Sequence, residues 1–195
     1  MDSIVKAKLI DRALASNGKK RISFDDDARK ELVEQAKDLS NHRKRFFFEV
    51  VCMIEFSPEL SAEELEISNE LVEQITGRDF YHGGSNGLSV GDLLKPSKVT
   101  WLDPREIGNI DPCRQEYVFF SSNKWVAASY AARLAREDRG TVGCTYRVKP
   151  SGSILVDPTA LRPFILLQDA SVKLDNLISP TNFCSTGAEI LEVIG

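Results

Sequence analysis

The stretch RDFYHGGSNGLSVGDLL, residues 78–94, marks the point at which the sequence changes character. It begins with an aromatic run typical of a β-strand and continues into glycine-rich segments typical of turns. His82, one of only two histidines in the chain, lies there between Tyr81 and a glycine pair. A histidine in this setting is a core residue, a helix-cap partner, a metal ligand or a ligand-binding group. The rest of the sequence has to distinguish these roles.

The residues before this stretch have the pattern of helices. Apolar residues recur at helical spacing over residues 4–14, and acidic residues at 25–27 suit the start of a second helix. The run RKRFFFEVVCMIEF predicts a third helix, and Ser61 with Glu64 forms a capping box for a fourth. We therefore expect a helical N-terminal region over residues 1–77.

The residues that follow have the composition of short strands separated by Gly, Pro and Asp. The strand candidates are DFYHG, EYVFFSS, TVGCTYRV, SILVD and AEILEVI. One long helix is expected among them at residues 123–137, with a small apolar face made by Trp125, Ala128, Ala131, Ala132 and Ala135. Because strands and helices do not alternate regularly, we predict an α+β domain with a mostly antiparallel sheet over residues 78–195.

The composition excludes several classes of protein. Hydrophobic residues make up 42 % of the chain and charged residues 28 %, which are globular values. No apolar run approaches the ~20 residues that span a bilayer, so no membrane association is expected. The N-terminus lacks the order of charged and apolar residues of a secretory signal. This predicts a cytoplasmic protein, or one delivered into a target cell without a visible signal.

Charge, cysteine content and missing motifs exclude further classes of protein and of functional site. The net charge is −4, without the basic excess of a dedicated nucleic-acid binder. Four cysteines without a Cys-x-x-Cys pair, and two histidines without an H-E-x-x-H motif, argue against a metal site. The usual dinucleotide and triphosphate loops and the G-x-S-x-G elbow are also absent from the sequence.

Three separated segments remain that carry polar groups in apolar surroundings. They are YHGG followed by LSVGD, the strand-to-helix segment YVFFSSNKWVAASYAARLA, and YRVKPSGSILVDP. In this order they resemble the ADP-ribosyltransferases, and especially the small rifamycin ADP-ribosyltransferases. The shared features are the Tyr-His-Gly segment, L-x-x-G-D, an Ala-rich helix with a Trp, and P-x-G-x4-D-P. The resemblance covers residues 80–194 and implies a split, mostly antiparallel sheet.

The resemblance implies that NAD is a co-substrate. A histidine of the first strand binds the ribose next to nicotinamide in this family, which implies that role for His82. Gly83 would let the backbone approach the nicotinamide amide. An aromatic ring of the second segment, here Phe119, would stack on the nicotinamide. The cofactor-binding residues implied are Tyr81, His82, Gly83, Tyr117, Phe119 and Ser121.

The sequence departs from the family pattern at two functional positions. The stacking residue is usually Tyr, whereas this chain has Phe119, with Phe120 as the next choice. The carboxylate that stabilises the ribosyl cation is Asp157 by the spacing of the rifamycin-modifying group, or Glu189 by analogy with poly(ADP-ribose) polymerases. Gly187, two positions before Glu189, speaks against arginine as the acceptor.

These residues predict an NAD-dependent mono-ADP-ribosyltransferase, a glycosyltransferase that releases nicotinamide. The resemblance implies that the chain is a toxin, an effector or a protein with the fold of an antibiotic-resistance enzyme. The helical region over residues 1–77 favours a protein or nucleic-acid acceptor over a small drug such as a rifamycin, and is a candidate for binding a protein partner. The alternative is a catalytically silent module of the same fold that binds NAD, ADP-ribose or another protein.

Overall fold

The computed structural model describes residues 26–55, 60–96, 116–137, 142–172 and 180–195. These ranges contain five helices and seven strands. The chain forms two compact units, and each unit combines two separate segments of sequence. Unit 1 comprises Met1–Glu64 and Pro158–Ser179, and unit 2 comprises Leu65–Asp157 and Pro180–Gly195.

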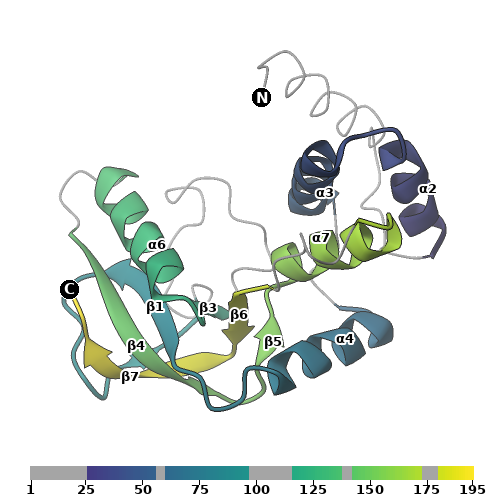
Figure 1. Cartoon of the computed structure of the whole chain (residues 1–195). Helices are drawn as coiled ribbons and strands as arrows, with labels where there is room; N and C mark the ends of the chain where they lie inside the picture. Colours follow the sequence, from purple (N-terminus) through teal and green to yellow (C-terminus); the bar gives the residue numbers. More distant parts are fainter. Residues whose placement is uncertain (1–25, 56–59, 97–115, 138–141, 173–179) are drawn as a thin grey trace. The chain divides into compact units, whose positions relative to one another are not determined.

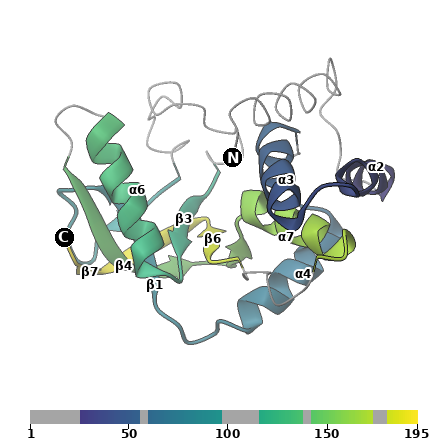
Figure 2. The same ribbon diagram turned by 45° about the horizontal axis from the view of Figure 1, so that its top comes forward.

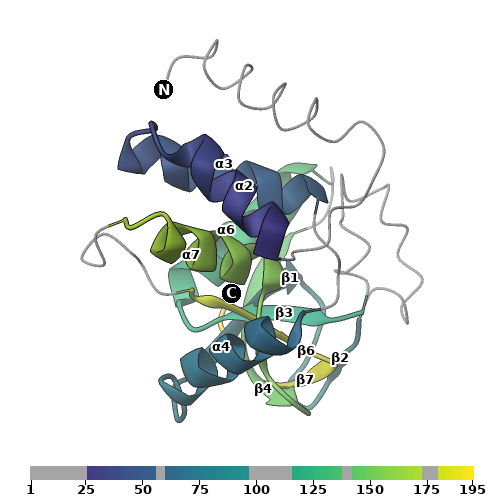
Figure 3. The same cartoon turned by 90° about the vertical axis from the view of Figure 1, so that its right-hand side faces the viewer.

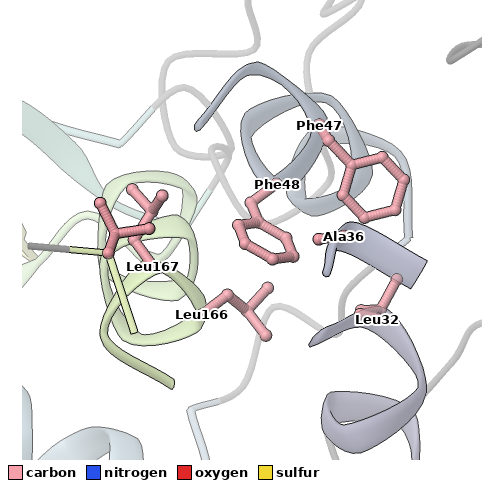
Figure 4. Packing of buried hydrophobic residues seen from close by; sticks show 7 residues of the cluster. Leu32, Ala36, Phe47, Phe48, Leu166 and Leu167 are labelled. Carbon is pink, nitrogen blue, oxygen red and sulfur yellow. The ribbon is translucent and has the colours of Figure 1, made fainter. Parts of the chain in front are cut away.

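Unit 1 is built around three helices, α2 (Asp26–Ala36), α3 (Asn41–Glu55) and α7 (Pro158–Asp169). The three helices lie close to one another (Figure 3), and side chains from all three pack into one apolar cluster (Figure 4). The buried members of the cluster are Leu32, Ala36, Phe47, Phe48, Leu166, Leu167 and Val172. The helices α2 and α3 were predicted from the sequence, and Asp26 and Asp27 do lie in the first turn of α2. Burial of these apolar side chains stabilises unit 1.

The helix α4 (Ala62–Glu73) begins with the predicted capping box. The backbone N–H of Ser61 donates to Glu64 Oε2 at 2.8 Å, and the N–H of Glu64 donates to Ser61 Oγ at 3.1 Å. Glu64 is buried and also accepts hydrogen bonds from Arg162 of α7, at 2.6 Å from Nε and 3.3 Å from Nη2. One carboxylate therefore caps a helix and pairs with a buried guanidinium.

The seven strands of unit 2 form a single sheet in which every pair is antiparallel. The strands are β1 (Phe80–Ser85), β2 (Leu93–Leu94), β3 (Val118–Ser121), β4 (Gly143–Ser151), β5 (Leu155–Val156), β6 (Asn182–Ser185) and β7 (Gly187–Val193). Their order is β2-β7-β4-β1-β3-β6-β5, which places β1 between β4 and β3. The predicted α+β class and antiparallel sheet are thus confirmed.

The two faces of the sheet are packed differently. On one face, the ring of Phe80 meets the rings of Phe120 and Phe183 edge-on, with centroids 5.0 and 5.6 Å apart. The other face is covered along β1 and β4 by α6 (Lys124–Glu137), as Figures 1 and 2 show. Because side chains alternate along a strand, neighbouring residues of β1 belong to these two different environments.

The structure differs from the sequence-based expectation in its division of the chain. The sequence predicted a boundary at Gly77, between residues 1–77 and 78–195. In the structure the boundary lies within α4, and α7 belongs with the N-terminal helices. The physical reason is the apolar face of α7, since Leu166 and Leu167 pack with Phe48 of α3.

Several elements were not predicted, and some predictions lie outside the described residues. The helix α7 and the strands β2 and β6 were missed. The helix expected at residues 4–14 lies outside the described ranges. None of the described helices is long and apolar enough to cross a bilayer.

Candidate functional site

The imidazole of His82 lies at the centre of the sheet, where β1 and β3 separate. The two strands share one backbone pair, Tyr81 with Ser121. Beyond it, His82 Nδ1 lies 2.7 Å from the carbonyl oxygen of Phe119 on β3. A carbonyl oxygen only accepts, so Nδ1 carries the proton of this hydrogen bond. In the neutral ring the lone pair is therefore on Nε2, which is left able to accept a hydrogen bond from a hydroxyl group.

The surroundings of His82 keep its ring neutral. Burial lowers the pKa of His82 below its ordinary value of 6.5, and the hydrogen bond to the Phe119 carbonyl opposes this only in part. The ring of Tyr146 on β4 stacks on the imidazole, with centroids 6.5 Å apart. Tyr146 is fully buried, and its hydroxyl donates to the carbonyl oxygen of Ser85 at 2.6 Å. The tautomer and the orientation of His82 are thus fixed by groups on three strands.

Gly84 makes room for the imidazole. A Cβ at position 84 would lie 2.8 Å from His82 Nε2, closer than a real Cβ contact allows. The absence of a side chain on this residue is what lets the ring lie along its own strand.

Gly83 has a structural reason of its own to be glycine. A Cβ at position 83 would lie 2.0 Å from the carbonyl oxygen of Ala127 and 2.8 Å from the backbone nitrogen of Ala131, both in α6. A Cβ at position 143 on β4 would lie at the same distance, 2.0 Å, from the carbonyl oxygen of Ala131. The two glycines allow the backbone of α6 to lie directly on the sheet. This differs from the role that the resemblance implies, in which Gly83 leaves space for nicotinamide.

The predicted stacking residue Phe119 touches His82 through its backbone. The pair Tyr81–Ser121 fixes the alternation, so Phe119, Ser121 and Tyr81 lie on the face of the sheet opposite His82. Phe120 lies on the same face as His82, but its ring is buried against Phe80. Neither phenylalanine therefore has its ring free beside the imidazole.

Ser121 and the residues after it join β3 to α6. The hydroxyl of Ser121 donates to the carbonyl oxygen of Thr181 at 2.7 Å and accepts from the backbone N–H of Asn123 at 3.1 Å. Asn123 Oδ1 accepts from the N–H of Trp125 at 3.0 Å, which caps the helix. Ser121 is buried, and Tyr117, just before β3, is half-buried. The sequence correctly placed the strand-to-helix junction here.

The first carboxylate candidate, Asp157, lies between β5 and α7. It is buried, and its backbone N–H donates to the carbonyl oxygen of Asn182 at 2.9 Å. Asn182 pairs with Ser121, which pairs with Tyr81, so these residues form one row toward Asp157 on the face of the sheet opposite His82. Asp157 also precedes Pro158, the first residue of α7, which is the position of a helix N-cap.

Asn182 is a polar residue of this row that the sequence did not single out. Its Oδ1 is buried and has no hydrogen-bond partner in the described part of the chain. Buried amide oxygens are nearly always bonded, so this atom is suited to a water or a ligand group. The only sequence signal was an Asn in the segment PTNFC, which is ordinary for a loop.

The second carboxylate candidate, Glu189, lies on the other side of β1. It is half-buried on β7, in register with Lys149 of β4 and Leu93 of β2. Two steps in the strand order separate β1 from β7, and three separate β1 from β5. At the usual strand spacing these are lateral distances of about 10 Å and about 14 Å. The structure brings His82 together with Phe119, and Tyr81 with Ser121, but not Asp157 with Glu189.

The motif LSVGD, residues 88–92, forms a turn that leads into β2. Asp92 Oδ2 accepts from the backbone N–H of Ser89 at 2.7 Å, and Gly91 has a φ of +91°, which favours glycine. The backbone of Gly91 and Asp92 bonds Ile190 of β7. The residue types of this motif are accounted for by local structure.

Neither a search for metal sites nor a comparison with known proteins assigns a function to this group of residues. Within the described ranges, no group of three or more His, Cys, Asp or Glu side chains is placed to hold a metal ion. No protein-family model matches the chain. A comparison with curated proteins also gives no significant match.

Proposed function

We propose that the chain is an NAD-dependent mono-ADP-ribosyltransferase with its NAD site at His82. The observation that carries this proposal is the 2.7 Å hydrogen bond between His82 Nδ1 and the Phe119 carbonyl, at the separation of β1 from β3. It leaves Nε2 of a neutral ring as an acceptor, which is what a ribose hydroxyl requires. The order of the three sequence segments supports the proposal by analogy with the ADP-ribosyltransferases.

In the proposed reaction, the bond between the ribose C1′ and the nicotinamide nitrogen breaks. The electron pair leaves with nicotinamide, and a carboxylate stabilises the positive charge that develops on the ribose. The acceptor then forms the new bond at C1′ and loses a proton to a base. His82 positions the ribose, and the charge stabilisation falls to Asp157 or Glu189.

Conservative variants and a nicotinamide-release assay distinguish which of the two carboxylates, Asp157 or Glu189, acts in the reaction. Asp157→Asn removes the charge but keeps a side chain that caps a helix, and Glu189→Gln keeps the shape of the strand residue. We expect the functional carboxylate's variant to lose about 100-fold or more in nicotinamide release. Glu192→Gln, on the same strand as Glu189, serves as the control and retains activity. Full activity in both test variants contradicts the mechanism.

The acceptor is proposed to be a macromolecule, either a protein or a nucleic acid. Incubation of the protein with labelled NAD and a cell extract sorts the label into protein, nucleic acid and small molecules. Label found only in small molecules contradicts this part of the proposal.

A second candidate function is a silent module that binds NAD or ADP-ribose without turnover. It is favoured by the placement of Phe119, whose ring lies on the face opposite His82 and has no hydroxyl. Calorimetry with NAD followed by the release assay distinguishes the two functions. Binding without nicotinamide release supports the module, and the absence of NAD binding contradicts both.

A further inference from the structure

The side of α6 that faces away from the sheet carries a large, solvent-exposed aromatic residue. Trp125 is 80 % exposed, the highest exposure among the large hydrophobic residues of the described chain. The helix packs on the sheet through Ala127 and Ala131, which are buried, so Trp125 points away from that contact. The sequence grouped Trp125 with Ala131 on one face, and the structure places them on different sides.

A stripe of side chains continues from Trp125 along the helix. Ser129, Ala132 and Arg133 follow at intervals of four, seven and eight residues, and all three are exposed. Because Ser129 and Ala132 have short side chains, little protrudes from the helix between the Trp125 indole and the Arg133 guanidinium. Eight residues of helix put Trp125 and Arg133 about 12 Å apart along the axis.

The charge of this surface is positive, in contrast to the chain as a whole. Lys124, at the start of α6, is also exposed. Along its whole length α6 has three basic residues, Lys124, Arg133 and Arg136, and one acidic residue, Glu137, whereas the whole chain has a net charge of −4. An anionic partner is therefore attracted to this helix and not to the chain in general.

We propose that the stripe formed by Trp125, Ser129, Ala132 and Arg133, together with Lys124 at the start of the helix, binds single-stranded nucleic acid. An exposed aromatic ring beside cationic side chains is the combination that holds unpaired bases by stacking and phosphates by charge. A protein partner would instead require an apolar patch around the indole, with few charges at its centre. The neighbours of Trp125 on the stripe are small, polar or cationic, which favours the nucleic acid. This binding requires neither NAD nor His82, so it is independent of the proposed transferase activity.

The test measures the fluorescence anisotropy of a labelled thymidine oligonucleotide with the full-length protein, over a range of salt concentrations. We expect binding that weakens with salt and that weakens at least about fivefold in Trp125→Ala, because stacking on the ring is lost. Trp125→Phe keeps a ring and loses less. Arg133→Gln lowers the slope of log affinity against log salt by about 0.7, the value for one phosphate contact on a single strand.

Matched controls come from exposed residues of the same unit. Arg78→Gln removes an equivalent charge away from α6, and Val142→Ser removes an exposed apolar side chain, 60 % exposed, outside the helix. Both variants are expected to bind the oligonucleotide as the unmodified protein does.

The proposal is overturned by any of three results: no binding at low salt, equal losses of affinity in Arg78→Gln and Arg133→Gln, or unchanged binding in Trp125→Ala. Equal competition by polyglutamate of the same charge also overturns it, because stacking then contributes nothing. The thermal unfolding midpoint of each variant confirms that the fold is retained.

Discussion

His82 shows how one residue acquires a defined chemical state from its surroundings. The Phe119 carbonyl determines which nitrogen is protonated, the Tyr146 ring holds the plane of the imidazole, and Gly84 leaves the space in which it lies. Each of these groups comes from the sheet itself and does not depend on a loop. A histidine that is held in one tautomer by the backbone is prepared to accept a hydrogen bond without rearrangement.

The lowered pKa of His82 predicts a pH dependence of stability. In the unfolded chain His82 titrates near 6.5, whereas burial keeps its pKa lower in the folded state. Below pH 6.5 the unfolded state therefore binds more protons, and the stabilisation from the neutral ring declines until the pH reaches the folded pKa. Above pH 6.5 the contribution is constant.

Urea unfolding between pH 8 and pH 5 checks this expectation. The difference in unfolding free energy between the unmodified protein and His82→Gln is expected to shrink as the pH falls from 7 to 5. His42→Gln, which replaces an exposed histidine of α3, is measured in parallel as the control. A difference for His82→Gln that does not change with pH contradicts the burial argument.

At the scale of elements, the contact between α6 and the sheet depends on two glycines. A Cβ at position 83 or 143 would lie 2.0 Å from a backbone carbonyl oxygen of α6, and neither group is a flexible side chain that can move away. We expect Gly83→Ala and Gly143→Ala each to lower the free energy of unfolding by about 3 kcal/mol, at the upper end of the usual cost of overpacking. Chemical denaturation measures the change.

Gly187→Ala is the matched control for these substitutions. A Cβ at position 187 would meet Leu94 O at 3.3 Å, a contact that a shift of a few tenths of an ångström relieves. Its cost is expected to stay below about 1 kcal/mol. Equal costs at positions 83 and 187 would show that α6 is not held as closely as the geometry states.

The elements that the sequence predicted well are those with local signals. The capping box of Ser61 and Glu64 and the acidic start of α2 were identified from a few neighbouring residues, and both are confirmed. The helix α7 was missed because Pro163 lies inside it, and a proline normally ends a helix. The boundary at Gly77 was expected from composition alone, which carries no information on where the apolar face of α7 packs.

The candidate site was predictable only in part, for the same reason. His82, Phe119 and Ser121 were singled out through the resemblance of their segments to a known family, and β1 does lie beside β3. The sequence does not contain the register, and the register decides that the Phe119 ring faces away from His82 while its carbonyl faces toward it. Asn182 carried no local signal, since its buried Oδ1 results from a pairing with Ser121 that is 61 residues away in the sequence.

At the scale of the whole molecule, unit 1 joins two distant parts of the chain through a buried ion pair. Arg162 and Glu64 are both buried, at a distance of 2.6 Å between Nε and Oε1. Arg162→Met leaves a buried carboxylate without its partner and is expected to cost about 3–5 kcal/mol. The double variant with Glu64→Gln removes the charge while keeping an acceptor for the Ser61 N–H, and is expected to recover most of the loss. A double variant as unstable as Arg162→Met contradicts this account.

The composition of unit 1 also predicts what happens when residues 1–77 are removed. The sequence suggested that these residues form a separate N-terminal region, but the cluster of α2 and α3 includes Leu166 and Leu167 of α7. A chain of residues 78–195 therefore exposes the apolar face of α7, and exposed apolar patches of this kind bind dyes and promote association. We expect strong fluorescence of 8-anilinonaphthalene-1-sulfonate and early elution in size-exclusion chromatography.

A second truncated chain, with Leu166→Lys and Leu167→Lys, is expected to lose the dye signal and elute as a monomer, because the same face is then charged. If instead the first truncated chain is monomeric and does not bind the dye, α7 does not need the N-terminal helices, and the sequence-based boundary at Gly77 describes the protein better than the division into two interleaved units.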